Sequence, residues 1–97
     1  MITPAQCRAA RALLDWSRDH LAERAGLDTT EVRRFEAGRS ALPSHRQAAV
    51  KKALEEGGAL FFDEDETVNG GAGVRLRRSR PHDEGLRPDQ LTAENDG

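Results

Sequence analysis

Residues 16–39 constrain the fold of this chain more than any other stretch. Gly26 divides the stretch into two short runs, and glycine adopts the left-handed conformation that ends a helix without steric cost. Ser17 precedes the first run and Asp28 the second, and both residue types cap helix N-termini. The sequence therefore predicts two short helices joined by a tight turn, over residues 18–25 and 28–37.

A further helix is predicted on each side of this pair. Thr3 and Gln6 have the spacing of a capping box, and Pro4 stands at a first helical position, where its missing N–H costs nothing. We expect this first helix to reach about Leu14. The fourth helix is predicted over residues 44–56, after a polar loop that contains a proline. The connections are all short, as is usual in a compact all-α unit.

The pattern changes after residue 59, where an aromatic run is followed by acidic residues and then by glycines. Residues 60–63 and 73–77 are predicted to form a β-hairpin, because the second segment alternates apolar and basic side chains. An isolated hairpin is marginal in water, so it must pack on the helices or pair with another chain. A dimer formed in this way would use the apolar residues of the hairpin, which are Leu60, Phe61, Phe62, Val74 and Leu76.

The expected fold is mainly α, with a compact four-helix domain over 1–58, a hairpin over 59–77 and a flexible tail over 78–97. The tail is polar and aperiodic, which is typical of disorder. The chain has 97 residues and a net charge of −2. Residues 1–59 hold ten basic and eight acidic residues, and residues 60–97 hold five and nine, so the acidic excess lies in the C-terminal part. The helical part is mildly basic, which gives weak support to a nucleic-acid partner.

Several classes of function are disfavoured by the sequence. The N-terminus lacks the apolar run of a signal peptide, and no stretch approaches a membrane span, so we expect a cytoplasmic protein. The single cysteine, Cys7, is expected to be a small core residue, with a redox sensor as the alternative. His20, His45 and His82 do not have metal-ligand spacing, and no nucleophile joins them. We therefore expect no metal, no cofactor and no enzymatic activity.

The segments Trp16-Ser17, Leu21 to Gly26, Val32, Phe35-Glu36 and Gly38-Arg39 resemble the phage-repressor and Cro-like helix-turn-helix regulators, often called the XRE family. The similarity covers roughly residues 5–56 and implies a repressor-like domain whose third helix enters the DNA major groove. Two departures are an arginine at position 18, where the family usually has glutamine, and a hairpin in place of a fifth helix.

The resemblance also implies roles for individual residues. Thr can hydrogen-bond a base or contact a thymine methyl, and Arg can bind guanine through two donors. The implied base contacts are Thr29, Thr30 and Arg34. The implied contacts to the DNA backbone are Ser17, Arg18, Arg33 and Arg39. A buried ion pair between Arg11 and Glu36 would join the first helix to the third.

Plainer interpretations remain open for these residues. The threonines can be ordinary neighbours of a helix cap, and paired arginines often form a solvated face. The arginines at 75, 77, 78 and 80 are expected to balance the acidic residues 63–66 across the hairpin.

The sequence thus predicts a sequence-specific transcriptional regulator that binds double-stranded DNA, as a homodimer on a palindromic operator. The alternatives are an antitoxin or phage-type regulator whose C-terminal part binds a protein partner, and an interaction module without DNA binding.

Overall fold

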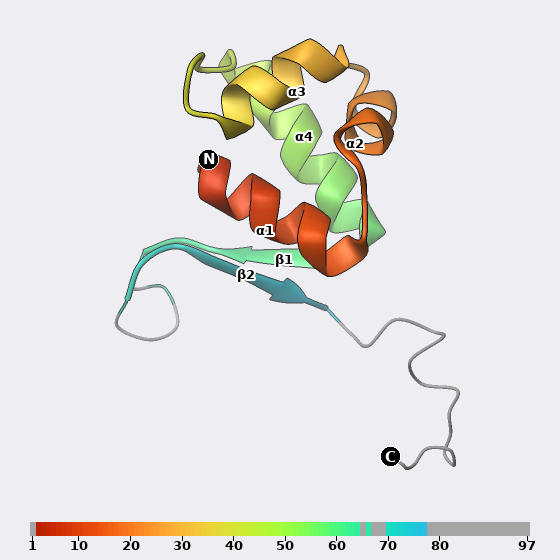
Figure 1. Ribbon diagram of the computed structural model, residues 1–97. Coiled ribbons are helices and arrows are strands. Elements are labelled where there is room, and N and C mark those ends of the chain that lie inside the picture. The colour runs from red at the N-terminus through yellow and green to blue at the C-terminus, as the bar shows by residue number, and fades with distance from the viewer. Residues whose placement is uncertain (1, 65, 67–69, 78–97) are drawn as a thin grey trace, which may run out of the picture.

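The computed structural model describes residues 2–64, 66 and 70–77, and in this part of the chain four α-helices precede an antiparallel hairpin (Figure 1). The elements are α1 (Pro4–Leu14), α2 (Arg18–Ala25), α3 (Thr29–Glu36), α4 (Ser44–Gly57), β1 (Ala59–Phe62) and β2 (Gly73–Leu76). The predicted mainly α fold is confirmed. The third helix is slightly shorter than predicted, because Asp28 and Ala37 are its caps. The predicted tail, with His82, lies outside the described residues.

The predicted caps set the boundaries of the first helices. The Thr3 hydroxyl accepts a hydrogen bond from the backbone N–H of Gln6 at 3.0 Å, and the Gln6 side chain accepts from the N–H of Thr3 at 2.9 Å. The Ser17 hydroxyl accepts from the N–H of His20 at 2.9 Å at the start of α2. Gly26 ends α2 with φ at +75°, in the left-handed region that its lack of a side chain permits.

The four helices enclose one apolar core. α2 packs on α3 and α4, and α1 packs on α3 and α4 as well. Trp16, in the connection between α1 and α2, is half-buried and packs against this core. The largest fully buried apolar side chains come from α2, α3 and α4, and they are Leu21, Leu54, Val32 and Val50.

The hairpin lies beside α1, on the side away from α3 (Figure 1). Leu60 is opposite Arg75 and Phe61 is opposite Val74 in its register. Since side chains alternate between the two faces of a strand, only one face can meet the helices. Phe61, Val74 and Leu76 pack against the core, whereas Leu60 and Phe62 are not part of that contact.

Gln6 fastens the hairpin to α1. Its Nε2 donates to the carbonyl oxygens of Phe62 at 3.0 Å and Gly73 at 2.8 Å, one on each strand. Only 4% of Gln6 is exposed, so these bonds lie away from competing water. The hairpin thus packs on its own helices, which is one of the two arrangements that the sequence left open.

Candidate nucleic-acid interface

The two sides of α3 differ in burial and in chemistry. Val32, Phe35 and Glu36 are buried on one side. Thr30, Arg33 and Arg34 are exposed on the other. This division follows from the helical period, which places residues three and four apart on the same side. The exposed side is polar and positively charged, and Figure 1 shows α3 at the rim of the helical domain, far from the hairpin.

Arginines on this side of α3 differ from the other arginines that the structure describes. Arg33, Arg34 and the nearby Arg39 have no side-chain partner among residues 2–64, 66 and 70–77. Every other described arginine contacts a carboxylate, a backbone carbonyl or an aromatic ring: Arg8, Arg11, Arg18, Arg24, Arg46, Arg75 and Arg77. The described arginines that are free to bind an outside anion are therefore gathered on α3 and the turn that follows it.

Arg39 stands close to the end of α3 because of the backbone turn at Gly38. Gly38 has φ at +74°, and the N–H of Arg39 donates to the carbonyl of Arg34 at 2.9 Å. This bond folds the chain back over the last turn of the helix. The exposed Arg39 therefore begins directly beside the last turn of α3.

Thr29 is already bound to another side chain. Its hydroxyl donates to Asp19 Oδ1 at 2.7 Å, which links the first turns of α2 and α3. The methyl group and the lone pairs of the hydroxyl oxygen remain available to a base. The hydroxyl proton is not, because it is used in the bond to Asp19. Thr30 is exposed beside it and forms no such link among the described residues.

The start of α2 offers a second polar position. The Ser17 hydroxyl accepts the capping bond of α2, and its own proton remains able to donate to a phosphate oxygen. Arg18 directs its Nε to Glu36 at 3.3 Å, and 46% of its side chain is exposed. Arg18 is therefore held over α3 while part of its guanidinium stays open to solvent.

Glu36 is the buried acceptor that joins α1 to α3. The expected ion pair is present and bidentate, with Arg11 Nε at 2.7 Å from Oε2 and Nη2 at 2.8 Å from Oε1. The Cys7 thiol also donates to Oε2 at 3.2 Å. Arg8 donates to the backbone carbonyl of the same residue. Glu36 itself is only 2% exposed.

The protonation of this cluster follows from its contacts. Burial alone would raise the pKa of the Glu36 carboxyl, but hydrogen bonds from Arg11 and Cys7 and the charge of Arg11 hold it below its ordinary value. Burial, together with the bond to Glu36, raises the pKa of the Cys7 thiol. Reactive thiols have the opposite shift, so Cys7 has the character of the core residue that we predicted.

Two hydrogen bonds, one in this cluster and one between α1 and the hairpin, could not be predicted from the sequence. The Cys7 thiol donating to Glu36 and the Gln6 amide donating to the hairpin both join residues far apart in the chain. A buried polar residue on an otherwise apolar helix face, such as Gln6, is the only sequence signal that could have indicated such a bond.

The proposed dimer residues do not share one face. Phe61, Val74 and Leu76 are used within the chain, and Leu60 and Phe62 lie on the opposite face with Arg75, whose guanidinium stands 5.1 Å from the centre of the Phe62 ring. Any second chain on this face would meet Leu60, Phe62 and Arg75.

No protein-family model matches the chain, and no curated protein that was compared with it is detectably similar. Within the described residues there is no group of three potential metal ligands. None of the described helices is both long enough and apolar enough to cross a membrane.

Proposed function

We propose that this protein binds double-stranded DNA sequence-specifically, with α3 in the major groove, as a transcriptional regulator similar to the XRE family. The observation that carries the proposal is the set of exposed arginines that have no partner within the described part of the chain, Arg33, Arg34 and Arg39. In a chain with an excess of acidic residues, arginines left without carboxylates form a site for an external polyanion.

In this proposal α3 reads the bases from its exposed side. Arg34 binds a guanine edge with two donors, and Thr30 contacts a neighbouring base. The Thr29 hydroxyl already donates a hydrogen bond to Asp19, so Thr29 contacts a base through its methyl group or through the lone pairs of its oxygen. Arg33 and Arg39 bind phosphates on either side of the groove.

The start of α2 supplies the remaining backbone contacts. Ser17 donates its hydroxyl proton to a phosphate, and the positive end of the helix dipole favours the same anion. Arg18 adds its solvent-exposed nitrogen atoms. Such contacts fix the orientation of the domain, while the base contacts supply sequence preference.

We further propose that two copies bind a palindromic operator, paired through the outer face of the hairpin. Recognition helices of such dimers stand about 34 Å apart. Leu60 and Phe62 are half-buried apolar residues on the face turned away from the core, and β1 and β2 pair with no third strand in the described chain. Leu60→Lys should give a monomer in sedimentation velocity, whereas Ala72→Lys in the exposed turn should not change the oligomeric state. A wild-type chain that sediments as a monomer at all concentrations would refute the pairing.

Selection from a random duplex library, followed by sequencing, tests DNA binding. We expect one enriched motif, and binding to that motif should weaken steeply with salt because phosphate contacts release counterions. The control is Lys52→Ala, which removes an exposed charge on α4 and should leave the motif unchanged. If the folded protein enriches no motif, the proposal is wrong.

A reducing cytoplasm suits this activity, because the one cysteine is buried and forms no disulfide in the described chain.

A further inference from the structure

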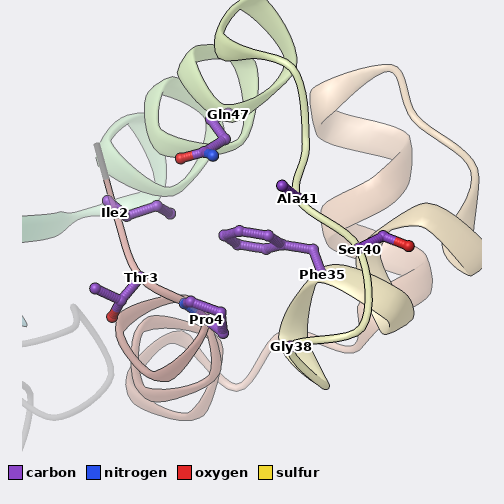
Figure 2. Close-up of a pocket in the computed structure, with 8 residues that line it drawn as sticks. All are labelled: Ile2, Thr3, Pro4, Phe35, Gly38, Ser40, Ala41 and Gln47. Carbon is purple, nitrogen blue, oxygen red and sulfur yellow. The ribbon is translucent and has the colours of Figure 1, made fainter.

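A hollow of about 360 Å³ lies between the start of α1 and the loop that joins α3 to α4. Figure 2 shows the ring of Phe35 extending into the hollow, with Ile2 and Pro4 on one side and Ala41 on the other. This volume falls in the lower part of the range of small-molecule sites. The hollow is therefore large enough to take a small organic ligand.

The walls of the hollow restrict the kind of ligand. Ile2, Pro4, Phe35 and Ala41 give apolar surface, and none of the described residues lining the hollow is charged. An ion would find no counter-charge here and would lose its hydration. The walls therefore favour an uncharged ligand with an apolar body, and the Phe35 ring favours a planar one.

Gln47 contributes a buried amide to the wall, whose other polar residues are Thr3 and Ser40. It is only 8% exposed, and its Oε1 has no hydrogen-bond partner among the described residues. The orientation of the amide is set by the other atom, because Nε2 donates to the carbonyl of Leu42 at 3.2 Å. A buried acceptor without a donor is unfavourable, so a ligand that brings a donor gains more here than it would at a solvated group.

The oxygen of Gln47 lies toward one end of the hollow. In Figure 2 the amide oxygen of Gln47 lies on the side of Ile2, a residue that both this hollow and a neighbouring one along α4 share with Gln47. Ile2 precedes α1 and belongs to no helix. A ligand in the hollow meets the oxygen at the end lined by Ile2 and Gln47.

We propose that the hollow binds a small, neutral, planar molecule that has an apolar body and a single N–H or O–H group, with Gln47 Oε1 as the acceptor. Nothing in this inference depends on DNA binding, so either proposal can fail without the other. Indole has the required shape and donor. Benzothiophene is a matched compound in which sulfur replaces the N–H.

The test is a titration of the full-length ¹⁵N-labelled chain with each compound, followed by amide correlation spectra. Indole should shift the side-chain amide of Gln47 and the backbone amides of Ser40 and Ala41 in a saturable manner. Benzothiophene should bind about tenfold more weakly, since one hydrogen bond is lost. No saturable shift with indole, or equal affinity for the two compounds, overturns the proposal.

Two variants assign the effect to the hollow. Gln47→Met keeps a similar unbranched shape without the acceptor, and it should bind indole as weakly as benzothiophene. Ala41→Leu, in an exposed loop position, should narrow the hollow and weaken both compounds. Lys52→Met, on the same helix but away from the hollow, should behave as the wild type. If a folded Gln47→Met variant still binds indole more tightly than benzothiophene, Gln47 Oε1 is not the acceptor.

Discussion

Arg11 and Glu36 are held together by two parallel hydrogen bonds of 2.7 and 2.8 Å, although 25 positions separate them in the chain. The pair ties α1 to the last turn of α3, the helix that carries the candidate base contacts. Glu36 also accepts from Arg18 on α2, so one buried carboxylate fixes three helices relative to one another. The exposed side of α3 keeps its orientation because its buried side is fixed at this point.

Replacing the buried carboxylate should therefore be costly. Glu36→Gln leaves Arg11 and Arg18 without their counter-charge, and we expect a loss of about 3–5 kcal/mol in the free energy of unfolding. Urea denaturation followed by circular dichroism measures this loss. Glu23→Gln is the control, since Glu23 is exposed on α2 and should change stability very little. A Glu36→Gln loss no larger than that of the control would show that the cluster is not stabilising.

The same carboxylate should make stability depend on pH. The pKa of Glu36 is lower in the folded protein than its ordinary value of 4.5, so its contribution is fully present above that value and disappears as the pH falls through the folded pKa. The free energy of unfolding should therefore change little through Glu36 above pH 4.5 and should fall as the pH is lowered below that value. In Glu36→Gln the drop should be smaller. Parallel pH curves for the two proteins would exclude Glu36 as the source.

The contact between α1 and the hairpin can be tested with a single near-isosteric change. Gln6→Glu keeps the oxygen that accepts from Thr3 in the helix cap but replaces the donor to Phe62 and Gly73 with a second acceptor. We expect a loss of about 1–3 kcal/mol and faster amide hydrogen exchange in β1 and β2. Ala9→Glu adds the same charge on the exposed side of α1 and should leave the exchange unchanged. Slow exchange retained in Gln6→Glu would mean that the hairpin is held by apolar packing alone.

Replacing Gly57 of α4 with alanine is expected to destabilise the protein, although alanine has the higher helix propensity. Alanine normally stabilises a helix relative to glycine by about 1 kcal/mol. At Gly57, however, an added Cβ would lie 2.6 Å from Trp16 Cζ2 and 2.8 Å from Cη2. Gly57→Ala should therefore lower the melting temperature and shift the fluorescence of Trp16, at a cost of about 1–3 kcal/mol for overpacking. Glu56→Ala, next to it and exposed, should be nearly neutral. A stabilised Gly57→Ala would show that the indole ring moves aside freely.

The arginines of the candidate interface should differ in their effects on DNA affinity and on sequence preference. Arg34→Ala should cost about 1–3 kcal/mol on the selected DNA motif and relax the preference at one base pair. Arg39→Ala should weaken all sequences similarly and reduce the salt slope by about one. Fluorescence anisotropy on the motif and on point-substituted duplexes separates the two effects. If Arg34→Ala leaves both affinity and preference unchanged, Arg34 is not a base contact.

Local sequence signals predicted the helices well because helix ends are determined by neighbouring residues. Thr3 with Gln6, Ser17 and Gly26 act within a few positions of themselves, and the structure has the helix ends that they indicate. The exposed side of α3 could also be predicted, since helical period alone separates Arg33 and Arg34 from Val32 and Phe35. The Arg11–Glu36 pair was predicted only through the resemblance to a family. Spacing in the chain gives no reason for residues 25 positions apart to be in contact.

Local sequence signals could not predict which face of the hairpin packs on the helices. Its strands could be predicted from apolar alternation, but alternation does not say which face meets the helices. Packing on α1 assigned Phe61, Val74 and Leu76 to the interior and left Leu60 and Phe62 outside. The five apolar residues that formed one predicted pairing surface are thus divided between two faces.

The sequence by itself determined the order, type and approximate ends of the six elements, because caps, turn glycines and periodicity act over a few residues. Tertiary structure decided which polar groups meet. It placed the Gln6 amide on two hairpin carbonyls, gathered Arg11, Arg18 and Cys7 on Glu36, and left Gln47 Oε1 without a partner among the residues that the structure describes. Those outcomes depend on how whole helices pack, since a buried hydrogen bond needs both partners brought within about 3 Å by the rest of the fold.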